Sequence, residues 1–150
     1  MYNKDISNMI IIDYATISEL ENIQKIDKIV VNNSERFDII KISIDNNQCL
    51  IAKADNKVAG YLIFNKSFYH NNFIELLIID QLFRRQGIGT ALIRFYENII
   101  KKGKIFTSTN KSNVIMQKLL NKLGYIESGI IYNLDEDDPE IIYFKKLEGK

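Results

Sequence analysis

The chain has 150 residues, which is room for one domain with one hydrophobic core, and its 46% apolar and 26% charged residues are ordinary for a globular protein. Its 20 basic and 19 acidic side chains give a formal net charge of +1, which argues against an electrostatic binder of DNA or RNA. The single cysteine excludes an internal disulfide framework. No stretch reaches the roughly 20 apolar residues of a membrane span, and the N-terminus lacks a signal-peptide pattern. We therefore expect a cytoplasmic location.

The N-terminal part predicts a short strand at Met9–Asp13, followed by a helix. Thr16 can cap this helix, with Glu19 three residues on as in a capping box. Its apolar stripe is expected at Ile17, Leu20, Ile23, Ile26 or Asp27, and Val30. A second helix should begin at Ser34. Its tail, residues 40–44, alternates like a strand, so the end of this helix is left open.

Three further segments predict the middle of a sheet. Cys49–Ala54, in which Cys49 should be buried, and Val58–Phe64 form a hairpin across Asp55, Asn56 and Lys57. Asn65–Asn72 is expected to be a polar turn, with the only histidine, His70, as a solvated residue of it. Phe73–Asp80 then predicts a central strand.

The C-terminal half alternates helices and strands without a linker or repeat, so residues 1–150 are expected to form one domain. The elements predicted are a helix at Gly87–Lys102, a strand at Ile105–Thr109, a helix that starts near Asn113, and a hairpin of Tyr125–Asn133 and Ile141–Lys146 around an acidic loop.

The turn between the Phe73–Asp80 strand and the following helix predicts a phosphate site. It reads Arg84, Arg85, Gln86, Gly87, Ile88, Gly89, an RxxGxG run. Glycines let the backbone approach a phosphate, the start of a helix offers free N–H groups, and arginines add positive charge. A dinucleotide fingerprint would need a third glycine where Leu92 stands, and no GxxxxGK[ST] phosphate loop occurs.

A second motif runs from Asn113 to Tyr125. Ser112 or Asn113 can cap a helix there, and Gly124 supplies the left-handed residue that ends it. The buried stripe of this helix is expected at Ile115, Met116, Leu119 and Leu123.

Together the two motifs resemble the GCN5-related N-acetyltransferases (GNAT), over roughly Asp13 to Lys146. The resemblance implies an α/β (α+β) fold with a mixed, mostly antiparallel sheet of six to seven strands and about four helices, splayed between two central parallel strands. It also implies an acetyl-CoA-dependent N-acetyltransferase, an acyltransferase that transfers the acetyl group directly to an amine in a ternary complex.

The resemblance assigns the cofactor residues as well. Pantetheine would pair with the backbone of Leu77, Ile78 and Ile79, and the Ile79 N–H would polarise the thioester carbonyl. Asn113 would hydrogen-bond the pantetheine arm. The pyrophosphate would lie on Arg84, Arg85, Gln86, Gly87, Ile88, Gly89 and Thr90. No cluster of histidine, cysteine and carboxylate has metal-ligand spacing, so no metal is predicted.

Glu75 is the candidate general base, because a charged residue is unusual in the apolar run FIELLIID. It shares strand parity with Leu77 and Ile79, so it can face the same side. The alternative is an exposed or salt-bridged glutamate without a catalytic role.

The family's usual tyrosine acid, seven residues after Asn113, is replaced by Leu120. Tyr125 is expected to be a core aromatic. Either the thiolate leaves unaided, which its pKa near ~8.5 allows and which we favour, or Tyr132 or Tyr143 of the last hairpin protonates it.

The acidic loop, with Asp135 and Glu136, is either a solvated turn or a feature that attracts a cationic acceptor. We expect a small-molecule or peptide amine as partner and neither nucleic acid nor membrane; the acceptor's identity and the formation of a homodimer are left open. The alternative function is a catalytically degenerate CoA-binding sensor or protein-interaction module of the same fold.

Overall fold

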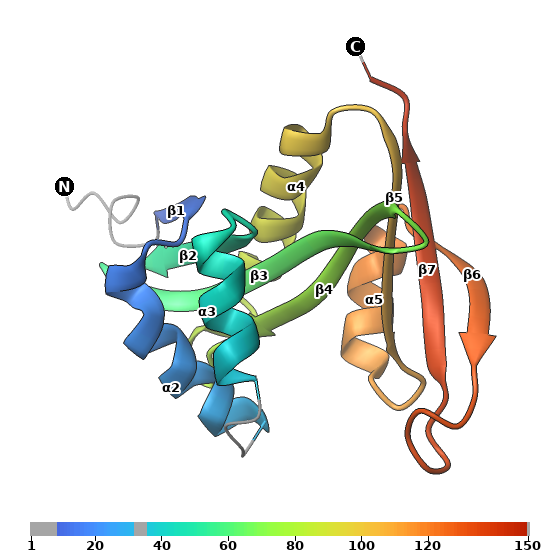
Figure 1. Cartoon of the computed structure of the whole chain (residues 1–150), viewed down its shortest axis with the longest axis horizontal. Coiled ribbons are helices and arrows are strands. Elements are labelled where there is room, and N and C mark those ends of the chain that lie inside the picture. Colours follow the sequence, from blue (N-terminus) through green and yellow to red (C-terminus); the bar gives the residue numbers. More distant parts are fainter. Residues whose placement is uncertain (1–8, 32–35, 150) are drawn as a thin grey trace, which may run out of the picture. The chain divides into compact units, whose positions relative to one another are not determined.

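The computed structural model describes residues 9–31 and 36–149 (Figure 1). Its elements are β1 (Ile10–Tyr14), η1 (Ile17–Glu19), α2 (Leu20–Val31), α3 (Phe37–Asp45), β2 (Cys49–Ala54), β3 (Lys57–Phe68), β4 (Asn71–Ile79), η2 (Gln81–Phe83), α4 (Ile88–Ile100), β5 (Gly103–Asn110), α5 (Val114–Lys122), β6 (Ile126–Ile131) and β7 (Glu140–Leu147). The strands pair in the order β1-β2-β3-β4-β5-β7-β6. β4 and β5 are parallel, whereas β1–β2, β2–β3, β5–β7 and β6–β7 are antiparallel. This mixed sheet with four α-helices in the described part confirms the predicted fold class.

The chain forms two compact units. The first contains Met1–Phe64 and Leu76–Tyr96, and the second contains Asn65–Glu75 and Glu97–Lys150. Strands β3 and β4 and helix α4 each run from one unit into the other. The single domain expected from the sequence remains a prediction. None of the described helices is long and apolar enough to cross a membrane.

The first unit has a layered core. Helices α2 and α3 cover one face of β2 and β3 (Figure 1), and their apolar side chains form one cluster, which includes Ile23, Ile26, Ile40, Ile44, Cys49, Ile51, Tyr61 and Ile63. The Tyr96 ring of α4 packs against Phe64 of β3 in a tilted arrangement with the centroids 4.9 Å apart. Cys49 is fully buried, as predicted, and burial raises the pKa of its thiol to about 12. The thiol is therefore an inert part of the core.

A buried carboxylate links three elements of the first unit. Asp27 of α2 is fully buried, and its Oδ1 accepts hydrogen bonds from the Tyr61 hydroxyl at 2.6 Å and from Arg36 Nη2 at 2.5 Å. Burial first, and the bond to Asp27 second, raise the pKa of Tyr61. The sequence left open whether Ile26 or Asp27 faces the core, and both do. Because a buried charge is costly without a partner, this cluster fixes α2 against β3.

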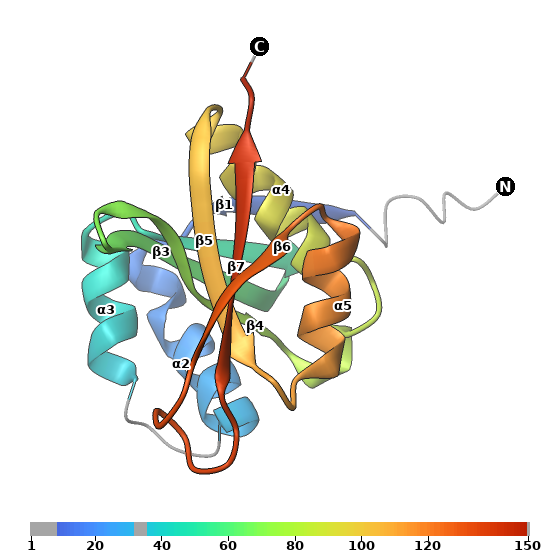
Figure 2. The same ribbon diagram turned by 90° about the vertical axis from the view of Figure 1, so that its right-hand side faces the viewer.

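The second unit is built around β5, β7 and β6, with α5 beside them (Figure 2). Glu97 near the end of α4 accepts hydrogen bonds from the Tyr125 hydroxyl at 3.0 Å and from Lys145 Nζ at 2.9 Å. Lys145 Nζ also donates to the Leu123 carbonyl at 2.8 Å, which fixes the end of α5 to β7. The buried Tyr125 confirms the expected core aromatic.

One segment predicted from the sequence is wrong, and the helix end that the sequence left open is settled. Residues 65–72 are not a polar turn: β3 extends to Phe68 and β4 begins at Asn71, so only Tyr69 and His70, both at positive φ, form the turn. The tail at residues 40–44 is helical, because Ile40 and Ile44 are one turn apart on the buried face of α3. Ser34, the predicted start of that helix, lies outside the described residues.

Candidate active site

The end of β4 sets the position of the predicted phosphate turn. The Asp80 N–H donates to the Ala59 carbonyl of β3 at 2.8 Å, which holds the last part of β4 in place. The Asp80 side chain accepts the Leu82 N–H at 3.0 Å, and its carbonyl accepts the Phe83 N–H at 2.9 Å. Asp80 therefore caps η2 and reverses the chain, so that it leads into α4.

The turn itself exposes Arg84, Arg85, Gln86 and Gly87, while Ile88 is buried and anchors the start of α4. Arg85 has φ 64° and Gly87 has φ 79°, so two residues of this turn are left-handed. A left-handed arginine costs about 1–2 kcal/mol, which glycine avoids. The first helical bond of α4 runs from the Ala91 N–H to the Gly87 carbonyl at 3.0 Å. The N–H groups before Ala91, including those of Gly89 and Thr90, therefore lie in the turn where helices leave N–H groups free for an anion.

Asn113 lies in the second unit as the N-cap of α5. Its side-chain oxygen accepts the Met116 N–H at 3.1 Å, which settles the choice between Ser112 and Asn113 as the cap. Because this oxygen is used by the helix, the amide group of Asn113 keeps its donor side for a ligand. Gly124, at φ 93°, ends the helix as predicted.

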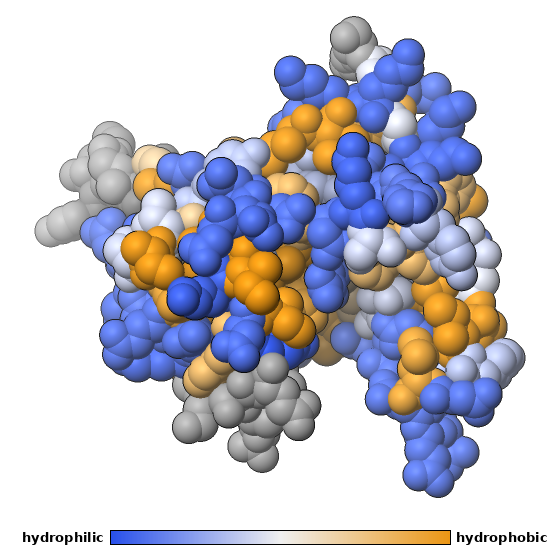
Figure 3. Space-filling view, in the orientation of Figure 1, coloured by the Kyte–Doolittle hydropathy of each residue, from blue (hydrophilic) through white to orange (hydrophobic). Residues whose placement is uncertain are grey.

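The acidic loop is fastened to the turn that carries Asn113. Asp135 Oδ2 accepts from Asn110 Nδ2 at 2.7 Å. Asp138 accepts from the Ser112 N–H at 3.0 Å and from the Ser112 hydroxyl at 2.6 Å. Glu136 is exposed, and the tip of this hairpin, at the lower right of Figure 3, is hydrophilic. A cavity of about 390 Å³ lies within residues 132–139. Two of the loop's acids thus have a structural role in addition to their charge.

Glu75 is exposed and held by a neutral amide. Its Oε2 accepts from Asn65 Nδ2 at 2.5 Å. Asn65 is itself fixed, since its oxygen accepts from the Ser67 N–H at 3.0 Å and from the Ser67 hydroxyl at 2.6 Å. No ion pair involves Glu75 within the part of the chain that the structure describes. The sequence missed Asn65 because it lies in the segment that was predicted to be a turn.

Leu120 is fully buried, whereas Ile115, predicted to be buried, is 82% exposed. Leu123 is buried as predicted, and Met116 and Leu119 are half-buried, so only Ile115 departs from the predicted stripe. A tyrosine at position 120 would overpack the core, which typically costs about 1–3 kcal/mol. Tyr132 is exposed. Tyr143 is fully buried, and its hydroxyl finds no hydrogen-bond partner among the described residues.

Tyr143 belongs to a row of residues that pair across three neighbouring strands of the second unit, β4, β5 and β7. Ile74 of β4 pairs with Thr107 of β5, and Thr107 pairs with Tyr143 of β7. The Thr107 hydroxyl donates to the Ile74 carbonyl at 3.0 Å. Ile74 and Thr107 are the last pair in the ladder of β4 with β5, which starts at Asn72 and Ile105. Burial first, and Glu127 second, raise the pKa of Tyr143, so its hydroxyl keeps its proton at neutral pH.

Residues 17–125 match the model of the acetyltransferase (GNAT) family. The chain belongs to the GNAT family. It is therefore an acyltransferase. An uncharacterised N-acetyltransferase of Methanocaldococcus jannaschii is 27% identical over 106 residues, 67% of each chain.

Two solved structures show the relation of this GNAT enzyme to its family. A GNAT acetyltransferase from Bacillus cereus is 40% identical with a TM-score of 0.86, and the match covers 92% of this chain and 97% of that one. A putative streptothricin acetyltransferase from Bacillus anthracis, in complex with acetyl coenzyme A, is 19% identical with a TM-score of 0.74, and the match covers 92% and 99%. The described residues contain no group of three or more His, Cys, Asp or Glu that could hold a metal ion.

Replacing Arg85 by glycine separates the charge of the turn from its backbone conformation. Arg85→Gly introduces a residue that adopts positive φ without strain, so the backbone conformation should stay the same. The free energy of unfolding should therefore stay constant or rise by up to about 1 kcal/mol. Loss of the guanidinium should weaken coenzyme A binding by about tenfold. Calorimetric titration and thermal unfolding measure the two effects.

Lys101→Gly is the matched control, because Lys101 is also an exposed cation at positive φ (67°) but follows the other end of α4. It should change stability in the same way and leave the affinity unchanged.

Gly89→Asp should abolish binding without unfolding the protein, because aspartate in a first helical turn favours the helix but repels a phosphate. Unchanged affinity in both Arg85→Gly and Gly89→Asp would show that the turn is not the phosphate site.

Proposed function

We propose that this GNAT enzyme transfers the acetyl group of acetyl-CoA directly to an amine, with both substrates bound at once. The observation that carries the proposal is the turn at residues 84–90, where two left-handed residues precede a helix that begins with free N–H groups. The bound acetyl coenzyme A in the Bacillus anthracis relative supports the cofactor. The single buried cysteine supports a cytoplasmic location.

The backbone of β4 supports a specific mode of pantetheine binding. The Asp80 N–H donates to β3, and the Ile78 carbonyl oxygen lies 2.9 Å from the place that a Cβ on Gly60 of β3 would take. Backbone groups of successive residues point to opposite edges of a strand, so those of Leu77 and Ile79 point away from β3. In this proposal they pair with pantetheine, the Ile79 N–H polarises the thioester carbonyl, and Ile78 pairs with β3 instead.

Glu75 is proposed as the base that removes a proton from the attacking amine. Its carboxylate is exposed and oriented by Asn65, which Ser67 fixes in turn. An oriented, accessible carboxylate is what a base needs to reach an amine directly or through one water.

Tyr143 is proposed to donate a hydrogen bond to the departing sulfur. Three observations support it over unaided departure: its hydroxyl is buried, has no partner among the described residues, and lies in the row where the ladder of β4 with β5 ends. An unpartnered buried hydroxyl costs roughly 1–3 kcal/mol, so a ligand that accepts its hydrogen bond would recover that free energy.

The acceptor is proposed to be a cationic amine, on a small molecule or a peptide, that binds near the acidic loop. Glu136 and Asp137 are exposed beside the cavity of the hairpin tip. Asp135, although bound to Asn110, still contributes its negative charge. The competing proposal, a CoA-binding sensor without turnover, rests on the missing tyrosine at Leu120.

A panel of amines separates these two functions. The protein is incubated with acetyl-CoA and small amines, amine antibiotics or peptides with free N-termini, and the released thiol is followed with a thiol reagent. Because Cys49 is buried, the native chain should add no signal. Thiol release that depends on one amine class supports the transferase. Binding of acetyl-CoA without release for any amine would favour the sensor.

Glu75→Gln should lower turnover by roughly 10²-fold at pH 7, with little change in acetyl-CoA affinity. The loss should shrink as the pH rises toward the amine's pKa near ~10, since more of the amine then arrives deprotonated. Glu21→Gln, at an exposed glutamate on α2, is the control and should retain full turnover. Full activity of Glu75→Gln at pH 7 would remove the assignment.

Tyr143→Phe should lower kcat by about tenfold or more, while the stability stays constant or rises, because the hydroxyl that is lost has no partner in the described structure. Since the pKa of Tyr143 is raised above its ordinary value near ~10, the ratio of wild-type to variant kcat should be constant between about pH 7 and pH 9. Tyr96→Phe removes another buried, unpartnered hydroxyl, one on α4, and should leave kcat unchanged. Unchanged kcat in Tyr143→Phe would remove the assignment of Tyr143.

A further inference from the structure

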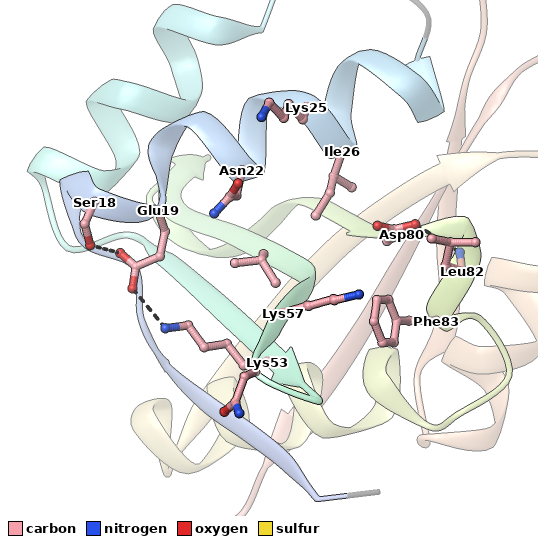
Figure 4. Close-up of a pocket in the computed structure, with 12 residues that line it drawn as sticks. Ser18, Glu19, Asn22, Lys25, Ile26, Lys53, Lys57, Asp80, Leu82 and Phe83 are labelled. Atoms are coloured by element: carbon pink, nitrogen blue, oxygen red, sulfur yellow. Dashed lines mark hydrogen bonds and ion pairs between the residues drawn. The ribbon is translucent and has the colours of Figure 1, made fainter. Parts of the chain in front are cut away.

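The first unit has a cavity of about 450 Å³ that the proposed transfer reaction does not use (Figure 4). It lies between the start of α2, the β2–β3 turn and the Asp80–Phe83 segment. Its lining includes three lysines, Lys25, Lys53 and Lys57, and two carboxylates, Glu19 and Asp80. The lining ends at Phe83, so the cavity shares no residue with the phosphate turn at residues 84–90.

Both carboxylates of the cavity are already used by the protein. Glu19 Oε2 accepts from the Thr16 N–H at 2.8 Å and from the Ser18 hydroxyl at 3.1 Å. Its other oxygen lies 3.6 Å from Lys53 Nζ. Burial alone would raise the pKa of Glu19, but the hydrogen bonds from Thr16 and Ser18 outweigh it and lower the pKa. Asp80 is occupied as the cap of η2. Both acids keep their negative charge, but Lys53 balances Glu19, and the lysines of the lining outnumber its carboxylates by three to two.

Two of the lysines, Lys57 and Lys25, have no ion pair or only a weak one among the described residues. Lys57 forms no ion pair within the described part of the chain, and in Figure 4 its side chain extends toward Phe83. Lys25 is exposed and has only a 3.6 Å pair with Glu21 on its own helix, a type of contact that is worth little. The lining also includes apolar side chains, among them Ile26, Val58 and Phe83.

We propose that this cavity is a second anion site, which takes a small organic anion with a flat apolar body. The ammonium group of Lys57, which extends toward Phe83, would hold a carboxylate or phosphate head, and Phe83 and Ile26 would cover the body. The proposal is independent of acetyl transfer, because it uses no residue of the proposed reaction.

Phenyl phosphate and benzoate are suitable probes, and amide chemical shifts of the ¹⁵N-labelled full chain locate where they bind. Both should shift the amides of Lys57, Val58, Leu82 and Phe83 in a saturable way. Phenol, which lacks the charge, and inorganic phosphate, which lacks the body, should bind at least tenfold more weakly at these amides. Equal affinity for inorganic phosphate and phenyl phosphate would overturn the prediction that the ligand has an apolar body. If phenyl phosphate alone shifts these amides, the head is a phosphate; if benzoate does so as well, any small anionic head suffices.

Lys57→Glu should weaken binding of both probes by about tenfold or more. The milder Lys57→Gln, which keeps most of the side-chain stem, should show a smaller loss in the same direction. Lys41→Glu makes the same change at an exposed lysine of α3, outside the cavity, and should have no effect. Equal affinity in wild type and both Lys57 variants, or shifts confined to the phosphate turn at residues 84–90, would overturn the proposal. Gly89→Asp should remove only the shifts at that turn, so the two sites can be tested separately.

Discussion

The hydrogen bonds of Asp80 are the constraint on which the first unit's candidate site depends. Its N–H closes the end of β4 onto Ala59, and its side chain and carbonyl fold the next three residues into η2. The first bond decides which backbone edge of β4 stays open, because it directs the neighbouring Ile79 N–H away from β3. The other two direct the chain into the arginine turn and the start of α4. The same segment forms one wall of the lysine-rich cavity.

A comparable constraint in the second unit joins the acidic hairpin to the turn before α5. Asp138 holds Ser112, next to the cap residue Asn113, and Asp135 holds Asn110. Hydrogen bonds to charged groups are stronger than neutral ones, so the position of Asn113 depends on the hairpin as well as on its own helix. The acids that would attract an acceptor amine therefore also help to place the residue proposed to hold the cofactor arm.

Catalysis in this enzyme is proposed to use a different tyrosine from the one that is usual in its family. Leu120 is buried in the core and leaves no hydroxyl at the usual position. Tyr143 has a buried hydroxyl without a protein partner in the described residues, and it lies in the row of Ile74 and Thr107. Glu75, the residue after Ile74, is oriented by Asn65.

The sequence by itself determined the family, the order of the elements and the position of the turn at residues 84–90, because these depend on short patterns: an apolar strand, RxxGxG, a helix start at Asn113 and a helix end at Gly124. Backbone preferences within a few residues encode such patterns. Only the tertiary structure decided that residues 65–68 continue a strand, since polar side chains on an exposed strand look like a turn. It also decided that Leu120 rather than Ile115 is buried, because propensity does not specify which face of a helix meets the sheet. The partners of Glu75, Asp135 and Asp138 lie 10, 25 and 26 residues away along the chain, and contacts of that separation exist only once the strands have paired.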